Sequence, residues 1–331
     1  MLQLGDGLAC CSAVFVAVLL VSRSAVWPAA VTASLYVLVA TFRFPQVPAG
    51  RAQQVLRPSR LSAGVSVIAH RGGGHDAPEN TIAAIREASQ NGAAAVELDL
   101  EFTADGVPVL MHDETVDRTT NGSGALSKLR FSELSQLDAA AKHRLSDKFR
   151  GAKIPTLHEA VEECIKLQLI IYFDVKGHPD EAATALKKLY EKHPVLYNSS
   201  IVCSFEPKVI YRMRQADPAV VTALTHRPWS LSHFGDGTPR FSSLWKKSFY
   251  QVLDVLLDWA HHHVLWNLCG VSAFLVQKNF VSIDYVQYWA NRGVEVVAWT
   301  TNSAVEKQYF QSLLKINYIT DSLKEDCSPH Y

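Results

Sequence analysis

The sequence predicts an α/β fold whose main domain is a (β/α)8 TIM barrel. Short segments rich in β-branched residues recur from residue 65 onward, and helical patterns such as residues 81–91 and 157–167 lie between several of them. Strands that alternate with helices are typical of a parallel sheet, and eight such units are typical of a closed barrel. The predicted strands are residues 65–69, 95–100, 169–175, 200–205, 220–225, 279–283, 294–300 and 317–320.

One further strand, residues 107–111, does not fit the alternation. Only four residues separate it from residues 98–102, whereas a parallel crossover needs about a dozen or more. The two segments are therefore expected to form an antiparallel β-hairpin after strand two, and Asp105-Gly106 is a favoured turn pair. A turn centred between these two residues would place Asp99 opposite His112.

The N-terminus predicts a membrane anchor over residues 1–42. Residues 8–21 and 25–42 are almost wholly apolar and are interrupted near Arg23, while one spanning helix needs about 20 apolar residues. Two arrangements remain open, a single span or a helical hairpin that turns near Trp27-Pro28. A cleaved signal peptide is disfavoured because the start is not basic and the second apolar segment is long.

Residues 43–64 contain three prolines and four arginines and are predicted to be a linker. The catalytic domain is then residues 65–331. A chain that starts near Ala63 is expected to keep the barrel fold and to lose the anchor.

A long insert, residues 227–278, separates predicted strands five and six. Its second half is apolar, but a single membrane span there would leave the last three strands on the wrong side of the bilayer. Polar residues at helical spacing predict an amphipathic helix that lies on the membrane or caps the barrel. Because a βα loop emerges at the active-site face, the insert is a candidate lid; an additional packing helix without a membrane role is the alternative. The polar residues are Gln251, Asp254, Asp258, His261 and His262.

Charge and cysteine content exclude two classes of function. The chain has 32 basic and 32 acidic residues, so it lacks the positive field of a nucleic-acid-binding protein. None of its six cysteines forms a CxxC pair, so a zinc site is not expected.

Alternating carboxylates on predicted strand two indicate a metal site. Glu97 and Asp99 are two residues apart and share one face of the strand, while Val96, Leu98 and Leu100 share the other. Carboxylates that face a barrel axis repel one another unless a cation compensates. Oxygen ligands favour Mg²⁺, Ca²⁺ or Mn²⁺. Salt bridges to Arg71 and Lys176 are the alternative explanation.

Two histidines follow predicted strands at the same rim. His70 and His112 each end an apolar segment, and two histidines beside carboxylates and cations are suited to general acid–base catalysis. Arg71 and Lys176 suit an anionic substrate, and the glycines 72–74 would allow a ligand to approach the backbone. These residues predict metal-assisted hydrolysis of a phosphate ester.

The ordered motifs resemble those of the glycerophosphodiester phosphodiesterase family, from about residue 65 to residue 322. The anchor and the insert further resemble the membrane-bound members of that family. The matching segments are residues 70–73 (HRGG), 78–81 (PENT), 97–99 (ELD), 105–109 (DGVPV), 112–113 (HD), 118–122 (RTTNG), 204–205 (SF), 299–302 (WTTN) and 319–321 (ITD).

The resemblance implies roles for individual residues. Glu97, Asp99 and Asp174 would bind Mg²⁺, with Ca²⁺ or Mn²⁺ as alternatives. His70 and His112 would exchange acid and base roles, and Arg71 and Lys176 would bind the phosphate. Trp299 and Asn302 are expected to line the substrate pocket. The substrates implied are diesters of the glycerophosphoinositol or glycerophospho-N-acylethanolamine type, cleaved to glycerol 3-phosphate and an alcohol.

The chain departs from the family pattern at one point, and this departure keeps other functions open. The family usually has Glu-x-Lys where this chain has Asp174-Val175-Lys176, which affects metal preference. The related sphingomyelinase D toxins have a similar Asp-x-Lys, so a lysophospholipase D or sphingomyelinase D-like enzyme acting on choline lipids is the second hypothesis. A non-catalytic membrane scaffold is the third.

The orientation of the predicted membrane protein rests on opposing signals. Asn198 begins a glycosylation sequon, which requires a lumenal or extracellular domain, whereas the arginines after the anchor favour the cytosol. Resemblance to ectoenzyme-like members favours an extracytoplasmic catalytic domain. The expected location is the plasma membrane or the membrane of the ER or an intracellular vesicle, with a lipid bilayer as partner.

Overall fold

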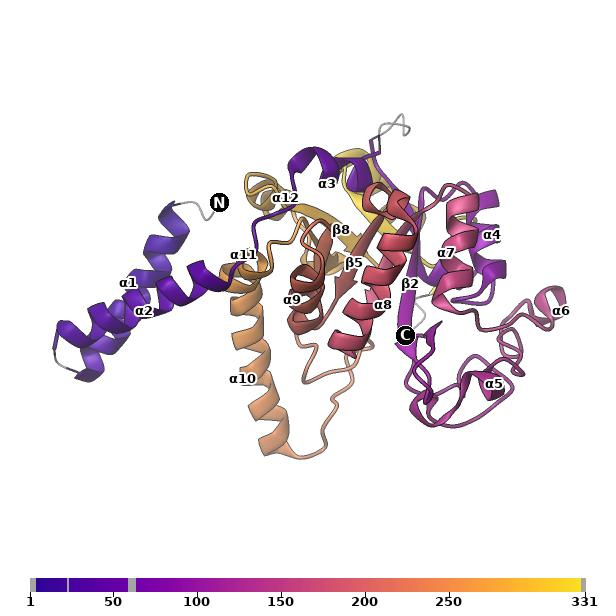
Figure 1. Ribbon diagram of the computed structural model, residues 1–331, viewed down its shortest axis with the longest axis horizontal. Coiled ribbons are helices and arrows are strands. Elements are labelled where there is room, and N and C mark those ends of the chain that lie inside the picture. Colours follow the sequence, from indigo (N-terminus) through magenta and orange to yellow (C-terminus); the bar gives the residue numbers. More distant parts are fainter. Residues whose placement is uncertain (1–3, 23, 59–63, 329–331) are drawn as a thin grey trace.

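The computed structural model describes residues 4–22, 24–58 and 64–328. Two helices, α1 (Leu4–Ser22) and α2 (Val26–Phe42), pack against each other and project from the body of the molecule (Figure 1). The chain reverses just before Trp27-Pro28, and Pro28 lies in the first turn of α2, where its missing N–H leaves no helical bond unmade. In the described part of the chain, we find no helix that is long and apolar enough to cross a membrane.

Eight parallel strands close into a barrel, as the sequence predicts. Strand β1 pairs with both β2 and β9, which closes the ring. The register sets Asp99 on β2 beside Asp174 on β4. The carboxyl ends of the strands therefore meet at one rim. The barrel strands are β1 (Val67–Ala69), β2 (Ala95–Phe102), β4 (Ile170–Val175), β5 (Ser200–Ser204), β6 (Thr222–His226), β7 (Ala273–Gln277), β8 (Glu295–Trp299) and β9 (Asn317–Thr320).

Helices cover the outside of the barrel (Figure 1). Side-chain caps fix several of their starts: Thr81, Thr156 and Ser303 each accept a hydrogen bond from a backbone N–H in the first turn. The longer helices are α4 (Ile82–Gln90), α7 (Leu157–Lys166), α8 (Pro179–Lys192), α9 (Pro207–Ala216), α10 (Leu244–Ala260) and α12 (Ile283–Ala290); the short ones are α5 (Phe131–Leu134), α6 (Ser146–Phe149), α11 (Trp266–Cys269) and α13 (Ala304–Gln308). The 3₁₀ segments are η1 (His70–Gly72), η2 (Leu126–Lys128), η3 (Pro194–Asn198) and η5 (Lys278–Phe280), and η4 (His261–Leu265) and η6 (Tyr309–Leu314) are π-helical.

The hydrophobic core has two main layers, which follow from the alternation of side chains along each strand. Val96, Leu98 and Leu100 pack outward against the helices, as predicted. The layer inside the barrel includes Ile68 and Ile319. Glu97 and Asp99 lie on the inward face of β2, so the strand directs its carboxylates toward the barrel axis.

The predicted sixth barrel strand, residues 279–283, is wrong. The strand in this position is β7 (Ala273–Gln277), and residues 278–282 are a 3₁₀ turn followed by the N-cap of α12. Ser282 caps α12 by accepting from the N–H of Tyr285. The apolar segment of β7 follows the apolar insert directly, so sequence composition does not separate them. The insert therefore ends before Ala273 rather than at residue 278.

The hairpin after β2 is confirmed, but its predicted register is wrong by one residue. Strand β3 (Pro108–Leu110) pairs antiparallel with β2, with Leu100 opposite Leu110. The loop has three residues rather than two, because the N–H of Gly106 donates to the carbonyl of Thr103 at 2.9 Å and Gly106 takes a left-handed φ of 74°. Asp99 therefore lies opposite Met111, and His112 follows at the rim.

The predicted linker, residues 43–64, contains a packed helix. Helix α3 (Ala49–Leu56) lies over the end of the barrel opposite the rim formed by the carboxyl ends of the strands, at the top of Figure 1, and buries Ala52, Val55 and Leu56 against the interior layer. The carbonyl of Leu56 accepts a hydrogen bond from Asn317 Nδ2 at 2.5 Å. The prediction of a linker gave weight to the prolines and arginines and overlooked an apolar face at helical spacing. Because this face is buried, α3 closes the barrel and does not act as a spacer.

Truncation of the chain should separate the anchor from this closing helix. A protein that starts at residue 43 should fold, whereas one that starts at residue 63 should lose roughly 4 kcal/mol or more, because burial of each large apolar side chain contributes about 1.5–3 kcal/mol. Leu56→Ala in the full chain should cost about 2–5 kcal/mol. Urea unfolding followed by circular dichroism measures these differences. Equal midpoints for the two truncated proteins would show that α3 is not part of the core.

Candidate active site

Three carboxylates from β2 and β4 meet at the carboxyl rim. Glu97, Asp99 and Asp174 are buried, and each places an oxygen within 4.8 Å of the other two. Burial and the neighbouring charge of Asp99 raise the pKa of Glu97 well above its ordinary value. The structure thus brings together the three residues that the family resemblance assigns to a metal.

Lys176 places positive charge beside this group. Lys176 Nζ lies 2.7 Å from Asp99 Oδ1 and forms a second ion pair with Asp174. Burial of Asp99 favours the neutral acid, but Lys176 outweighs it and holds the pKa of Asp99 well below its ordinary value. The Oδ1 of Asp174 is buried without a hydrogen-bond partner. An unsatisfied oxygen in an all-carboxylate set fits a hard divalent cation such as Mg²⁺, Ca²⁺ or Mn²⁺.

Arg71 connects the first strand to these carboxylates. Its backbone N–H donates to Glu97 Oε2 at 2.8 Å, and its side chain lies 3.7 Å from Asp99 Oδ2 and donates to Glu79 at 3.1 Å. The salt bridges that the sequence offered as an alternative to metal are therefore present as well. Arg71 has a left-handed φ of 54°, which costs an L-residue about 1–2 kcal/mol and points to a constrained functional position.

The glycine after Arg71 has a different role from the predicted ligand approach. A Cβ on Gly72 would lie 2.8 Å from the Cβ of Ala84 in α4. Gly72 also has a φ of 81°, which glycine adopts readily. The residue is therefore required for close packing of the rim against α4.

His70 is held by a carboxylate that follows the last strand. Its Nδ1 lies 2.6 Å from Asp321 Oδ1. Because a carboxylate only accepts hydrogen bonds, Nδ1 carries the proton and Nε2 is left to exchange one. Asn302 donates to Asp321 Oδ2 at 2.6 Å and accepts from the backbone N–H of Asp321 at 2.9 Å. The predicted pocket role of Asn302 is therefore wrong: this residue is buried behind Asp321 and positions it.

His112 is held in the same way by its neighbour in the chain. Its Nδ1 lies 2.7 Å from Asp113 Oδ1, and Arg118 donates to Asp113 Oδ2 at 2.6 Å. Arg118 also donates to both oxygens of Glu79. Burial and the nearby ammonium of Lys176 lower the pKa of His112. Each histidine is thus oriented by a carboxylate on Nδ1, which leaves Nε2 to exchange a proton.

The sequence did not identify the residues that position these groups. Asp321, Asp113, Glu79 and Arg118 lie in the segments that carry the family resemblance, but nothing in the sequence assigns their partners. Asp113 could have been found because it adjoins His112. Asp321 could not, since 251 residues separate it from His70. Asn80, which donates to Asp99 Oδ2 at 2.6 Å, was also missed, although only 19 residues separate the two.

A cavity of about 760 Å³ opens beside the two histidines. One wall is the catalytic rim, including Arg71 and Lys176. The other wall comes from the insert, so the predicted lid position of the insert agrees with the structure. Trp299, which the sequence assigns to the substrate pocket, lines this cavity. The insert and apolar wall residues are Phe205, Arg227, Leu231, Phe234, Asp236, Arg240, Leu257 and Trp299.

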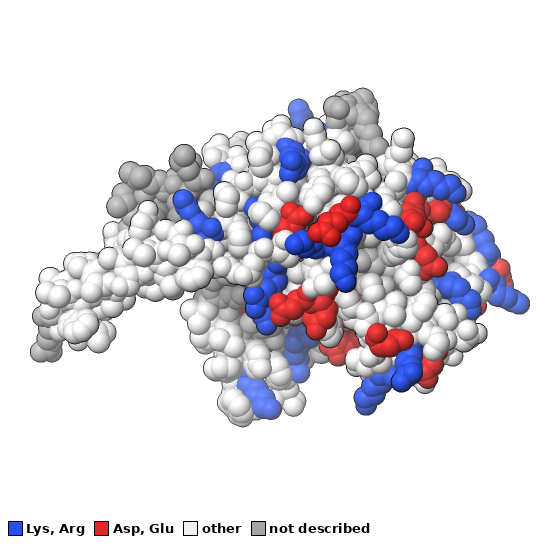
Figure 2. Space-filling view, viewed as in Figure 1, with Lys and Arg blue, Asp and Glu red and all other residues white. Residues whose placement is uncertain are grey.

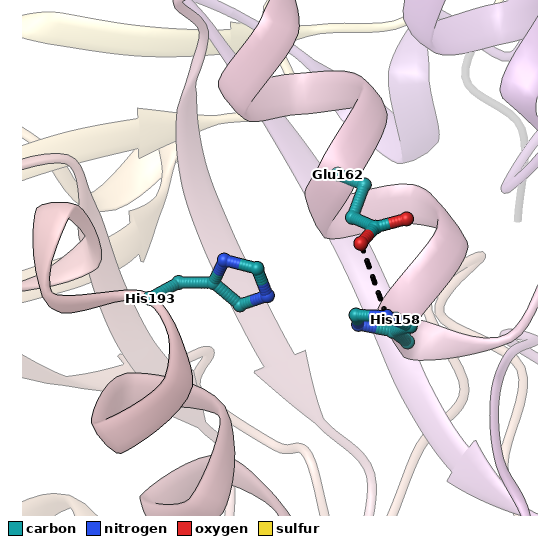
Figure 3. Close-up of side chains that lie close together, drawn as sticks. All are labelled: His158, Glu162 and His193. Atoms are coloured by element: carbon teal, nitrogen blue, oxygen red, sulfur yellow. Dashed lines mark ion pairs between the residues drawn. The ribbon is translucent and has the colours of Figure 1, made fainter.

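A second group with metal-binding residue types lies on the outside of the barrel. His158 and Glu162 on α7 and His193 after α8 point toward one another (Figure 3). His158 Nε2 lies 3.1 Å from Glu162 and only 2.7 Å from Lys192 Nζ. The lysine ammonium already supplies the positive charge of this cluster, which lies far from the histidines of the rim.

A third cluster attaches the insert to the barrel. His226, at the end of β6, lies 2.8 Å from Asp258 on α10, and its ring contacts those of His261 and His262. His262 in turn lies 3.0 Å from the hydroxyl of Tyr285. Burial and the two neighbouring histidines lower the pKa of His226 to about 4. His226 is therefore uncharged at neutral pH.

Acid should loosen this attachment. The unfolded chain binds a proton at His226 with a pKa of about 6.5, above the folded value of about 4, so stability falls as the pH drops through this window. Between pH 7 and pH 5 the free energy of unfolding should fall by on the order of 1–2 kcal/mol. His226→Asn should flatten this dependence and His263→Asn, an exposed control, should not. Urea unfolding at several pH values measures this dependence. If the free energy of unfolding changed equally with pH in both variants, His226 would not be the group responsible.

Asn198, the predicted glycosylation site, ends η3 on the side of β5 remote from the rim and is exposed. A glycan there would not obstruct the cavity.

Comparison with known proteins shows what this chain is similar to. The profile of the Glycerophosphoryl diester phosphodiesterase family matches residues 70–325. Glycerophosphodiester phosphodiesterase 1 of Mus musculus is 59% identical over 320 residues, which cover 97% of this chain and 96% of the mouse protein. The Homo sapiens protein of the same name is 58% identical over 314 residues, with coverage of 95% and 94%.

Solved structures show the same fold. A phosphodiesterase from Oleispira antarctica, in complex with the product sn-glycerol-3-phosphate, has a TM-score of 0.61 at 25% identity and covers 77% of this chain and 92% of its own. A glycerophosphodiester phosphodiesterase from Agrobacterium tumefaciens has a TM-score of 0.61 at 23% identity, with coverage of 78% and 97%.

Proposed function

This chain belongs to the glycerophosphoryl diester phosphodiesterase family, and we propose that it cleaves its glycerophosphodiester substrates with a divalent cation and a pair of histidines. The observation that carries the proposal is one constellation. Two histidines, each oriented by a carboxylate, lie on the same rim as a buried triad of carboxylates, and His70, His112, Glu97 and Asp174 all line one cavity. The chain is accordingly a phosphoric diester hydrolase, and the scaffold hypothesis is set aside.

The carboxylates, the cationic side chains and the histidines would have separate roles in the reaction. Glu97, Asp99 and Asp174 would hold the cation, which supplies charge stabilisation for the phosphoryl oxygens. Arg71 and Lys176 would add positive charge at the same phosphate. One histidine accepts a proton from the nucleophile as its oxygen bonds to phosphorus. The other donates a proton to the leaving alcohol oxygen as its bond to phosphorus breaks. The nucleophile is water or a hydroxyl of the substrate's own glycerol; in the second case the first product is a cyclic glycerol phosphate, which water must then open to give glycerol phosphate.

The products proposed are glycerol 3-phosphate and an alcohol. The glycerol 3-phosphate complex of the Oleispira antarctica phosphodiesterase supports this. The alcohol would occupy the insert side of the cavity, where Phe205, Trp299 and Leu231 provide apolar surface and Arg227 and Arg240 provide charge. A cavity of about 760 Å³ is within the usual range for a small-molecule site of about 300–1,000 Å³. Both an inositol and an N-acylethanolamine group match part of this wall.

A choline lipid is the second candidate substrate, and one observation favours it. Asp174 and Lys176 form an ion pair in the arrangement of the Asp-x-Lys motif that resembles the sphingomyelinase D toxins. In this case the enzyme would release choline and leave a phosphorylated lipid. The apolar side of the cavity would then hold the acyl chain rather than the alcohol.

A substrate panel distinguishes these candidates. The purified full chain with Mg²⁺ is incubated with glycerophosphoinositol, a glycerophospho-N-acylethanolamine and lysophosphatidylcholine, and products are identified by mass spectrometry. Release of glycerol 3-phosphate from the first two supports the proposal. Release of choline from lysophosphatidylcholine alone would assign the second candidate. Trp299→Ala should raise KM for the N-acylethanolamine diester more than for the inositol diester, because it removes apolar surface.

Membrane attachment through residues 1–42 and an extracytoplasmic catalytic domain are part of the proposal. The apolar α1–α2 hairpin, with large exposed side chains such as Val21 and Trp27, supports attachment, and the exposed Asn198 supports the orientation. Glycosidase treatment should increase the mobility of the protein expressed in animal cells but not of Asn198→Gln. An unchanged mobility of the parent protein would place the domain in the cytosol or leave the sequon unused.

A further inference from the structure

Helix α10 in the insert has its polar face turned toward the barrel. Asp254 is only 5% exposed, and its carboxylate accepts hydrogen bonds from the backbone N–H groups of Leu231 and Ser232 at 2.8 and 3.0 Å. One turn later Asp258 pairs with His226. Hydrogen bonds and an ion pair thus hold the inner face of α10. A helix on the surface of a soluble domain normally has the opposite arrangement.

The outer face of α10 is apolar and uncovered. Its large side chains follow the helical spacing of three and four residues and include a tryptophan near each end. They are Leu244, Trp245, Phe249, Val252, Val255, Leu256 and Trp259, which are between 48% and 81% exposed. Soluble monomers rarely expose an apolar stripe that runs the length of a helix, and such a surface marks a binding face for a protein or a membrane.

We propose that the outer face of α10 inserts into one leaflet of a lipid bilayer. Tryptophans are enriched at membrane interfaces because the indole is apolar and carries one polar N–H. Lys246 and Lys247 lie in the first turn of α10, where ammonium groups would reach lipid phosphates. The stripe between Trp245 and Trp259 is wholly apolar, which suits the acyl region of the bilayer.

The position of α10 in the molecule argues for lipid rather than for a second protein. Helix α2 reaches the body beside α11, at the end of α10, and the N–H of Phe44 donates to the carbonyl of Leu268 there (Figure 1). The apolar surfaces of the α1–α2 hairpin and of α10 thus adjoin. In Figure 2 the described residues of the projecting part of the hairpin are white on this face, without lysine, arginine, aspartate or glutamate. One bilayer surface could contact both elements at once.

The same helix forms part of the substrate cavity. Leu257 of α10 lines it, and so do Leu231 and Phe234 from the loop that precedes the helix. Insertion of the outer face would place this wall against the lipid interface, where an amphiphilic diester resides. This consequence rests on the proposed function; the contact of α10 with lipid does not.

Spin labels test the contact directly in the full chain. Phe249→Cys, Val252→Cys and Leu256→Cys are made in a protein whose Cys10, Cys11 and Cys327 are serine, labelled, and reconstituted into phosphatidylcholine vesicles that contain phosphatidylserine. Val195→Cys, 51% exposed and on η3, is the matched control. Labels on α10 should collide with oxygen and be protected from a water-soluble nickel chelate, unlike the control.

Two results would overturn the proposal. Nickel accessibility equal to that of the control would mean that the face of α10 is in water. Dipolar broadening between labels that grows with protein density would mean that a second copy covers it.

An activity assay tests the consequence for substrate. The triple variant Trp245→Gln, Phe249→Gln, Leu256→Gln should lose at least tenfold in rate on a vesicle-borne diester and keep its rate on soluble glycerophosphoinositol. Equal loss on both substrates would indicate a folding defect and overturn the role of α10 in substrate access. Absence of activity in the parent protein would refute the proposed function and leave the spin-label result to decide the membrane contact.

Discussion

Alanine at His70 or at His112 is expected to lower kcat for glycerophosphodiester hydrolysis by about 10²–10⁴-fold, the usual effect of removing a proton carrier. Each ring has its Nδ1 bound to a carboxylate, Asp321 or Asp113, so each presents one nitrogen for proton exchange. The double variant should be scarcely slower than either single variant, because the two groups act in one step. Steady-state kinetics on the full chain measures both effects.

A change of leaving group separates the two histidines. A diester with a highly acidic alcohol needs no proton on its leaving oxygen, so it should restore the rate only of the variant that lacks the acid. Asn302→Ala should give a smaller loss than His70→Ala, because Asn302 acts through Asp321. Thermal unfolding provides the control for folding. Near-normal turnover in both single histidine variants would contradict the mechanism.

Glutamine at Glu97 is expected to reduce kcat by about 10³-fold, since charge stabilisation by a metal contributes several kcal/mol to the transition state. In the absence of metal the same change should stabilise the fold. Burial and repulsion by Asp99 raise the pKa of Glu97, so a neutral amide relieves an unfavourable charge. Kinetics with Mg²⁺ should show the loss of activity, and thermal unfolding in EDTA should show the gain in stability.

Two matched variants complete this test. Asp99→Asn should also lose activity but should destabilise the metal-free protein, because Asp99 pairs with Lys176 at 2.7 Å. Glu101→Gln changes the next acidic residue on the same strand, which lies 3.7 Å from His178 and outside the triad, and it should leave kcat within a few fold. A loss in Glu101→Gln as large as that in Glu97→Gln would show that the triad is wrongly assigned.

The sequence predicted those features of the fold that depend on local patterns. The alternation of strands and helices gave seven of the eight barrel strands their places, and the four-residue connection after residue 102 required a hairpin. Strand β7 was missed because its apolar segment continues the apolar insert. The hairpin register was missed because the loop has three residues rather than two. The pair Asp105-Gly106 is compatible with both loop lengths and does not determine which one forms.

In the candidate site, too, the sequence predicted the features that depend on local spacing and missed those that depend on long-range contacts. Glu97 and Asp99 could be placed on one face from their spacing alone, and the family resemblance supplied Asp174. The carboxylates that orient the histidines could not be assigned, since His70 and Asp321 meet only when the barrel closes between β1 and β9. Helix α3 was taken for a linker because its prolines and arginines are more conspicuous than its short apolar face. Long-range closure, rather than local preference, determines these contacts.

The rate at which chelator-stripped protein releases glycerol 3-phosphate, followed as Mg²⁺ is added back, tests the central claim most directly. The triad of Glu97, Asp99 and Asp174 has a buried oxygen without a partner and a raised pKa at Glu97, so the stripped protein should be inactive and activity should rise to saturation with the metal. Ca²⁺ or Mn²⁺ in place of Mg²⁺ establishes the preference that Asp174 confers. Hydrolysis at the full rate in excess EDTA would contradict a metal-dependent mechanism.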